Sequence, residues 1–426
     1  MNNRIGFAIP ILSLLILSQN AFSSNESNGF IDGAKGNLLL RNYFINKNYV
    51  GDSAVKNYSR EWTQNFILEI KSGYTPGVIG FGVDGLGLLS VKLDGGRGTT
   101  GTGLLPDDSP HSYGYVGATA KSKFSKSELR YGDLRPRNPM VIATDTRSLP
   151  QVFRGLDFSS KEIDGLELQF SVLQKGKSRV SEDMETLTYN KIKGGDFYYG
   201  GGKYVYSKDT SFSLWSSKFE DIYQQNYVNL TQFYNIDNVR LGADLNYWWG
   251  KDTGSSKAGK LDNKTFSSAL TAQYGGNKLI FGYQHLEGSS KWMRLDGAGG
   301  GFLSNDSLSN SFDSPKERSY QIRHEYDFTH VGVPGLKIMN RYTKGTNIHN
   351  KFTDNGREWV RETELYYTFQ TGALKKLSVS YKNITLRQTH GTRNENENRI
   401  TFNYPLGLFW CYTVSVIGND WLVSHD

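Results

Sequence analysis

The chain has 426 residues, a formal net charge of +7 and a single cysteine, Cys411. One cysteine cannot form an internal disulfide or a thiolate metal site, so a disulfide scaffold is excluded, and we expect no metal and no cofactor. The positive charges are spread along the chain, which argues against a nucleic-acid-binding protein. Aromatic residues make up 13% of the chain, yet the mean hydropathy is only −0.52. This combination is typical of a β-barrel with an apolar outside and a polar lumen, although a soluble carbohydrate-binding β-protein could share it.

The first residues have the features of an export signal. Arg4 supplies a positive charge, an apolar run extends from Ile5 to Leu17, and Ala21-Phe22-Ser23 is a small-x-small cleavage site. The apolar run is too short for a membrane-spanning helix, and no later stretch approaches the roughly 18 apolar residues that one requires. No cysteine follows the run to accept a lipid. We therefore predict a signal peptide over residues 1–23, an exported protein and no transmembrane helix.

Apolar and polar residues alternate strictly in many segments between Asn37 and Phe409. In the clearest segment, from Val239 to Tyr247, every odd-numbered residue is apolar and the residues between them are polar or Gly. Successive side chains of a β-strand point to opposite faces, so the pattern predicts strands with one apolar and one polar face. Further segments with this alternation are 66–70, 79–83, 166–172, 279–283, 320–327, 377–382 and 400–404.

Alternation alone leaves two all-β architectures open, because the apolar face packs in the core of a soluble sandwich and contacts lipid in a transmembrane barrel. The export signal and aromatic residues at expected strand ends, such as Trp62, Tyr247 to Trp249 and Trp292, favour the barrel. Four long polar segments are the expected loops: 95–112, 134–150, 249–262 and 286–316. In such barrels some loops fold inward and narrow the pore. We predict one antiparallel transmembrane β-barrel domain over residues 24–409.

Several motifs resemble those of the OprD-type porins, also described as outer-membrane carboxylate channels. The resemblance extends from about Gly29 to Phe409, nearly the whole mature chain. The motifs are Gly29-Phe30-Ile31, 37–44, Glu61-Trp62-Thr63-Gln64, 80–84, Lys92-Leu93-Asp94, 100–106, Leu149-Pro150-Gln151, 221–225 with Tyr227, 315–320, 332–336 and Tyr404-Pro405-Leu406. The resemblance implies a monomeric outer-membrane barrel of about 18 strands, pinched by inward-folded loops. It also implies contact with outer-membrane lipid and lipopolysaccharide, and assembly by the barrel-assembly machinery.

The resemblance further implies a ladder of basic side chains that guides a substrate carboxylate. An anion that leaves water needs donors along its path, and a guanidinium can bind a carboxylate bidentately. The positions that match ladder members are Lys47, Arg60, Arg130, Lys382 and Arg399. The last three are also offset by one from apolar neighbours, which predicts lumen-facing side chains. Where the family has two lumen arginines spaced by two, this chain has Ser380 and Lys382, and a family lysine is replaced by Tyr366. The ladder is thinner than usual, so the individual solute stays open.

Loop residues add four candidates. The family often places a loop carboxylate opposite the ladder to receive a substrate amino group, and Asp313 and Asp306 are the candidates here. If either lines the constriction, amino-acid-like or betaine-like solutes are expected; if neither does, simple aromatic or aliphatic carboxylates fit better. Arg147 and Arg154 bracket the Leu-Pro-Gln motif of the expected constriction loop, and the sequence does not show where they point. Each of these residues, and each ladder residue taken alone, could also be an ordinary solvated side chain.

The segment from Ile400 to Phe409 resembles the final strand of an outer-membrane barrel, yet residues 410–426 follow it and match nothing in the family. Two interpretations of this tail remain. It is a frameshifted or read-through extension, which would impair folding, or it is a genuine periplasmic extension.

Three other functions are compatible with an exported β-barrel. A barrel hydrolase needs a positioned nucleophile and base, and the chain has seven His but no G-x-S-x-G motif. An energy-coupled transporter would carry an N-terminal plug domain, for which there is no room before the first expected strand at Asn37. A general, non-selective porin is the closest alternative. We predict a passive channel of the outer membrane, not an enzyme, that selects small carboxylates or amino acids.

Overall fold

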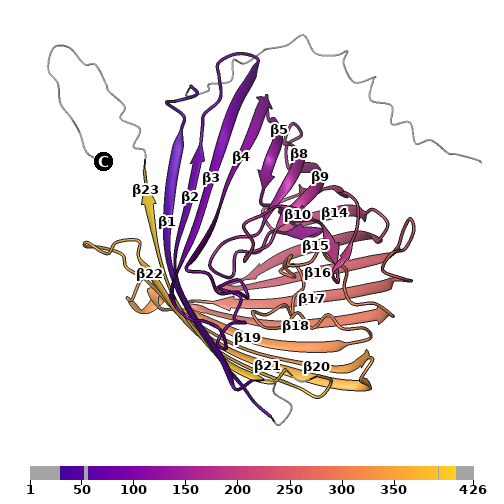
Figure 1. The fold of residues 1–426 in the computed structure, drawn as a ribbon. Coiled ribbons are helices and arrows are strands. Elements are labelled where there is room, and N and C mark those ends of the chain that lie inside the picture. The colour runs from indigo at the N-terminus through magenta and orange to yellow at the C-terminus, as the bar shows by residue number, and fades with distance from the viewer. Residues whose placement is uncertain (1–28, 52–55, 392, 409–426) are drawn as a thin grey trace, which may run out of the picture.

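The structure is a computed structural model that describes residues 29–51, 56–391 and 393–408. The predicted signal peptide and the tail beyond Phe409 lie outside the described residues. The described chain is an 18-strand closed antiparallel β-barrel with almost no helix (Figure 1). This confirms the predicted fold class. No helix among the described residues is both long and apolar enough to cross a membrane.

The wall consists of long strands that pair in chain order. They are β1 (Lys35–Tyr49), β2 (Tyr58–Lys71), β3 (Ile79–Asp94), β4 (Ser112–Phe124), β5 (Ser127–Leu134), β8 (Val152–Ser160), β9 (Leu166–Lys177), β13 (Phe197–Val205), β14 (Thr210–Phe219), β15 (Tyr223–Ile236), β16 (Val239–Asp252), β17 (Asp262–Tyr274), β18 (Asn277–Gly288), β19 (Arg318–Asp327), β20 (Leu336–Asn350), β21 (Thr353–Thr368), β22 (Ser378–Gln388) and β23 (Glu395–Gly407). The loops contain short elements, namely β6 (Arg137–Asn138), β7 (Val141–Ile142), β10 (Glu185–Thr186), β11 (Thr188–Tyr189), β12 (Ile192–Lys193) and the 3-10 helix η1 (Phe328–Val331).

The ring closes where the first wall strand pairs with the last. Asn37 lies opposite Gly407 and Tyr49 lies opposite Glu395, and Figure 1 shows indigo β1 beside yellow β23. A closed ring pairs the backbone groups of every wall strand with a neighbour, as a bilayer without water requires.

Strand β16 shows the two faces of the wall. Tyr247 and Trp249 are exposed on the outer face, whereas Asn246 and Trp248 are buried in the interior. The alternation predicted for this segment is confirmed. The strand continues to Asp252, so the loop that follows it begins later than predicted.

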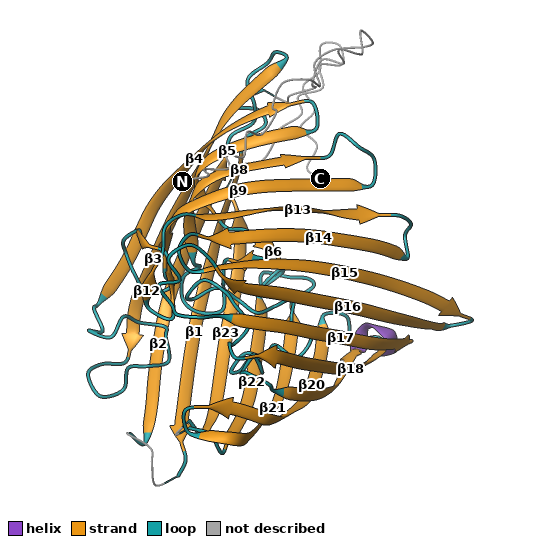
Figure 2. Ribbon diagram, turned by 90° about the vertical axis from the view of Figure 1, so that its right-hand side faces the viewer, coloured by secondary structure: helices purple, strands orange, loops and turns teal. Residues whose placement is uncertain are grey.

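The two ends of the barrel differ in their connections. At one end the turns are short: Asp237, at φ 48°, and Asn238 join β15 to β16, and Gly275-Gly276 join β17 to β18. Residues that tolerate positive φ are the ones that two-residue hairpin turns favour. The opposite end carries the longer loops 95–111, 135–151, 178–196 and 289–317. Figure 2 shows loop segments gathered inside the barrel.

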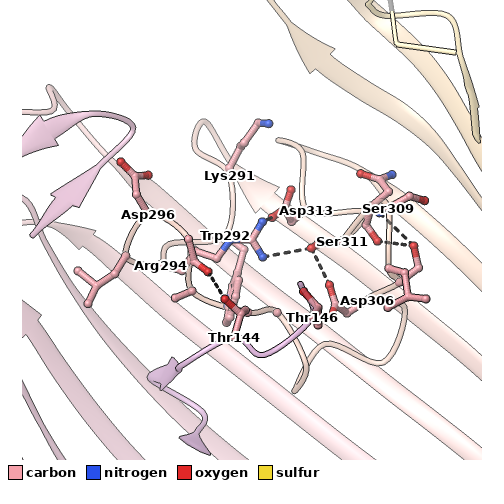
Figure 3. Close-up of a pocket in the computed structure, with 18 of the residues that line it drawn as sticks. Thr144, Thr146, Lys291, Trp292, Arg294, Asp296, Asp306, Ser309, Ser311 and Asp313 are labelled. Atoms are coloured by element: carbon pink, nitrogen blue, oxygen red, sulfur yellow. Dashed lines mark hydrogen bonds and ion pairs between the residues drawn. The ribbon is translucent and has the colours of Figure 1, made fainter. Parts of the chain in front are cut away.

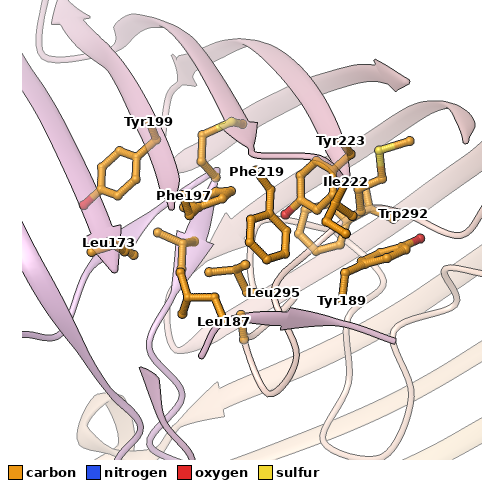
Figure 4. Packing of buried hydrophobic residues seen from close by; sticks show 14 of the residues in the cluster. Leu173, Leu187, Tyr189, Phe197, Tyr199, Phe219, Ile222, Tyr223, Trp292 and Leu295 are labelled. Atoms are coloured by element: carbon orange, nitrogen blue, oxygen red, sulfur yellow. The ribbon is translucent and has the colours of Figure 1, made fainter. Parts of the chain in front are cut away.

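A cluster of aromatic and aliphatic side chains fills part of the interior (Figure 4). It joins wall residues such as Phe197 and Trp248 to loop residues such as Tyr189 and Trp292. The prediction that Trp292 lies at a strand end is wrong: it belongs to loop 289–317, is 4% exposed, and has its ring centroid 5.7 Å from that of Trp248. The loop folds inward, so this ring is buried against the wall and does not contact lipid. The loops are therefore held by a packed apolar core.

Candidate functional site

Three inward-folded loops surround a cavity of about 610 Å³ in the lumen. Residues of loops 135–151, 178–196 and 289–317 line it, together with Arg341 of β20 and Arg393, which precedes β23 (Figure 3). The side chains at its wall are mostly polar or charged. A cavity of this size fits a small organic solute.

Arg147 and Arg179 lie side by side at this cavity. Nη1 of Arg147 donates to the Thr146 carbonyl oxygen at 2.8 Å, and Nη1 of Arg179 donates to Thr146 Oγ1 at 2.8 Å. Within the described part of the chain neither guanidinium has a carboxylate within 4.0 Å. Burial, with Arg399 and Arg179 nearby, lowers the pKa of Arg147 to about 10, so it stays protonated at neutral pH. Both guanidinium groups thus line the cavity without an ion-pair partner among the described residues.

Basic residues in the neighbouring wall, and Arg393 just before β23, are by contrast paired with acids. Arg399 Nε contacts Glu397 Oε1 at 2.5 Å, Lys47 Nζ lies 3.6 Å from Glu397 Oε2, and Arg393 Nη2 lies 2.8 Å from Glu395 Oε1. The positive charge of these residues is largely neutralised by their acidic partners.

Arg341 and Arg399 also fix loop 289–317 to the wall. Arg341 Nε donates to Glu362 at 2.7 Å, and Glu362 in turn accepts from the Leu308 amide at 3.0 Å. Arg399 Nη2 donates to the Leu308 carbonyl oxygen at 3.2 Å. The backbone of Leu308 is therefore fixed at both its amide and its carbonyl.

Acidic residues line the same cavity. Arg294 Nη2 contacts Asp313 Oδ2 at 2.8 Å, and its Nη1 donates to Ser311 Oγ at 3.1 Å (Figure 3). Ser311 then donates to Asp306 Oδ1 at 2.6 Å. Burial raises the pKa of Asp306 to about 6. Asp306 and Asp313 thus lie on the cavity that Arg147 and Arg179 also line.

The other predicted residues lie away from the cavity. Arg130 contacts Asp84 at 3.3 Å and Lys382 contacts Glu364 at 2.9 Å, both nearer the short-turn end of the lumen. Arg154 contacts Asp133 at 3.0 Å. Arg60 alternates with the buried residues of β2, shares the exposed face with Trp62, and pairs with Asp94 at 3.0 Å. Arg60 does not join the lumen group, because its strand turns it outward.

Several basic residues near the cavity were missed by sequence reasoning. They are Arg41, Arg179, Arg294, Arg341 and Arg393. Arg41 stands in a family motif and bridges to Asp145 of loop 135–151 at 2.6 Å, so the motif could have indicated it. Arg179 and Arg294 lie in loops, where no periodicity shows direction. Ser380 of β22 lies opposite Tyr366 of β21 in the pairing of these two strands.

A closed barrel with an apolar outer face, a polar lumen and loops that narrow it defines a transmembrane pore of the porin class. The family model described as outer membrane porin, OprD family, matches residues 28–408, and the chain belongs to this family. It is therefore an outer-membrane channel protein whose wall contacts membrane lipid.

Known proteins agree with this assignment. The chain is 42% identical over 408 residues to the porin-like protein GalP of Pseudomonas putida, covering 94% of this chain and 98% of that protein. It is similar to the crystal structure of Pseudomonas aeruginosa OpdK with vanillate, with a TM-score of 0.85, 36% identity, and coverage of 89% and 100% of the two chains. It is also similar to Pseudomonas aeruginosa OccK2 (OpdF) in complex with glucuronate, with a TM-score of 0.82, 38% identity, and coverage of 89% and 98%.

Proposed function

We propose that the chain is a diffusion channel selective for small carboxylates, whose carboxylate group binds Arg147 and Arg179 in the lumen cavity. The observation that carries this proposal is the pair of neighbouring guanidinium groups that have no carboxylate partner in the described part of the chain. Two such groups repel each other, and an anion between them relieves the repulsion. Vanillate and glucuronate, which similar channels bind in crystals, both carry a carboxylate.

The ladder residues extend the path in this proposal. Arg399 and Lys47 lie in the wall near the cavity, and Arg130 and Lys382 lie nearer the short-turn end. A carboxylate that leaves the cavity would meet Arg130 and Lys382 next. Their acidic partners keep each step weak, so that the solute can leave again.

Asp306 widens the range of solutes in the same proposal. Its carboxyl group lines the cavity, and Arg294 and Arg341 are the positive charges near it. A solute with an ammonium group beside its carboxylate would place that group against Asp306. Amino-acid-like solutes are therefore included with simple carboxylates.

The same proposal includes four further points. The channel works as a monomer, contacts lipopolysaccharide, is assembled by the barrel-assembly machinery, and loses residues 1–23 as a signal peptide. One chain closes the barrel and supplies every described residue of the cavity, which supports a channel that works as a monomer.

Solute permeation in planar bilayers tests the function. We expect benzoate to permeate faster than a neutral sugar of similar size, with arginine compared in the same membranes. Equal passage of all three would contradict selectivity, and the absence of any pore would contradict a channel.

The preference for anions is expected to rise as the pH falls from 7 to 5, with a midpoint near the Asp306 pKa of about 6. Above the midpoint Asp306 is ionised and repels anions; below it the carboxyl group is neutral. One unit charge about 6 Å from the ion changes permeability by about threefold in a water-like dielectric. Reversal potentials in a KCl gradient measure the effect.

The matched variant is Asp306→Asn, which should show the low-pH preference at every pH in this range. Asp164→Asn serves as control, because Asp164 is exposed in the turn between β8 and β9. An unchanged pH profile in Asp306→Asn would assign the titration to another group.

A further inference from the structure

Glu61 of β2 is a fully buried carboxylate that a loop surrounds with donors. Its Oε1 accepts from the Gly101 amide at 3.2 Å. Its Oε2 accepts from the amides of Leu104 at 3.1 Å and Leu105 at 3.4 Å, and from the Thr102 hydroxyl. Successive backbone amides that converge in this way form an anion-binding nest.

Glycines make this loop shape accessible. Gly101 has φ +107° and Gly103 has φ +81°, values that side chains with a Cβ rarely adopt. A Cβ on Gly103 would also lie 3.4 Å from Nε of Arg147. The contact distance is an ordinary one, so it is the positive φ of Gly101 and Gly103 that the motif over residues 100–106 supplies to the turn beside Arg147.

The same loop holds the constriction loop 135–151 through its carbonyl groups. The Thr102 carbonyl oxygen accepts from Arg147 Nε at 2.9 Å, and the Leu104 carbonyl oxygen accepts from Ser148 Oγ at 2.8 Å. Two carbonyls adjacent to the Glu61 nest thus bind two consecutive residues of the loop that carries Arg147.

We propose that Glu61 is a positioning residue for Arg147: by holding residues 101–105 it fixes the Thr102 carbonyl that directs the Arg147 guanidinium at the cavity. This inference rests on the proposed function, because it assumes that Arg147 binds the permeating anion. It links an acid on β2 to the selection of anions. An acid near a pore would ordinarily oppose anions.

The sign of this effect gives the test. Glu61→Gln replaces an acid by a neutral amide whose NH₂ group faces donors in the nest. If Glu61 acted only through its charge, the chloride-to-potassium permeability ratio would rise. If it positions Arg147, the ratio falls by about threefold, as for the loss of one unit charge near the ion, and Arg147→Ala falls by a similar factor. Reversal potentials of the full chain in planar bilayers under a KCl gradient measure the ratio.

A second variant keeps the acid. Thr102→Val removes one donor to Glu61 while leaving Glu61 in place, and we expect a smaller fall in the same direction. If Glu61→Gln forms no pores, the Thr102→Val result decides whether Glu61 positions Arg147. Glu69→Gln is the control, because Glu69 lies on the lumen face of the same strand and pairs with Arg135, not with residues 101–105; its ratio should not fall.

Provided that Arg147→Ala lowers the ratio, an unchanged or higher ratio in Glu61→Gln pores overturns the positioning role. If Glu61→Gln forms no pores, the same result in Thr102→Val pores overturns it. A wild-type channel without anion preference, or an Arg147→Ala variant that keeps the full preference, instead overturns the proposed function on which the inference rests.

Discussion

Replacing both Arg147 and Arg179 by Ala is expected to lower the preference of the channel for carboxylates over neutral solutes by about tenfold. Each guanidinium about 6 Å from the permeating anion contributes about 0.7 kcal/mol in a water-like dielectric, which is a factor of about three, and the two factors multiply. Neither residue has an acidic partner within the described chain that would be left unpaired, so the fold should tolerate the change. Benzoate flux into liposomes, relative to a neutral sugar, measures the effect.

Two comparisons make this result specific. Arg154→Ala removes an arginine that pairs with Asp133 away from the cavity, and we expect the carboxylate preference to change little. Replacing Arg147 and Arg179 by Lys keeps both charges but loses the planar donors, so an intermediate preference is expected. A double Ala variant with wild-type preference would locate the selective step elsewhere in the lumen.

The substitution Trp292→Ala should both destabilise the barrel interior and widen the pore. Trp292 is 4% exposed and packs edge-to-face on Trp248. Removal of a buried Trp side chain costs about 3–5 kcal/mol. Because Trp292 anchors the loop that carries Arg294, Asp306 and Asp313, the loop loses its fixed position and the single-channel conductance is expected to rise. Conductance in planar bilayers and the temperature at which the barrel unfolds in detergent measure the two effects.

Trp249→Ala is the matched control for this prediction. Trp249 neighbours Trp248 in β16, yet it is exposed on the outer face, so its loss should leave the conductance unchanged. A Trp292→Ala channel with wild-type conductance would show that the other contacts of loop 289–317, such as those at Leu308, suffice to hold it.

The wall of the barrel could be predicted from the sequence because each strand carries its own signal. Between Val239 and Tyr247, apolar residues face outward and polar residues inward, and this pattern needs no information from other strands. The position of Trp292 could not be predicted in this way. An aromatic residue at a strand end and one in an inward loop occur in similar local sequence, and only the path of the loop separates them.

The site residues show the same difference between strands, whose side-chain directions could be predicted, and loops, whose directions could not. Arg130 and Lys382 take their direction from their strands, and the structure places both in the lumen. The approach of Arg147 to Arg179 depends on two loops that meet only in the folded barrel, so no spacing in the sequence indicates it. Arg60 shows the opposite error: the motif indicated a ladder residue, but the register of β2 turns it to the exposed face.

The pairing of β1 with β23 has a consequence for how the chain reaches its folded state. The contact joins residues that are nearly the whole described chain apart, and folding slows as contacts become more distant in sequence. Until Glu395–Gly407 is in place, β1 and the most recently added strand both present unpaired edges, which are sites of aggregation. Loss of the last strand would therefore do more than shorten the wall. It would leave an open sheet with two unpaired edges in place of a closed barrel.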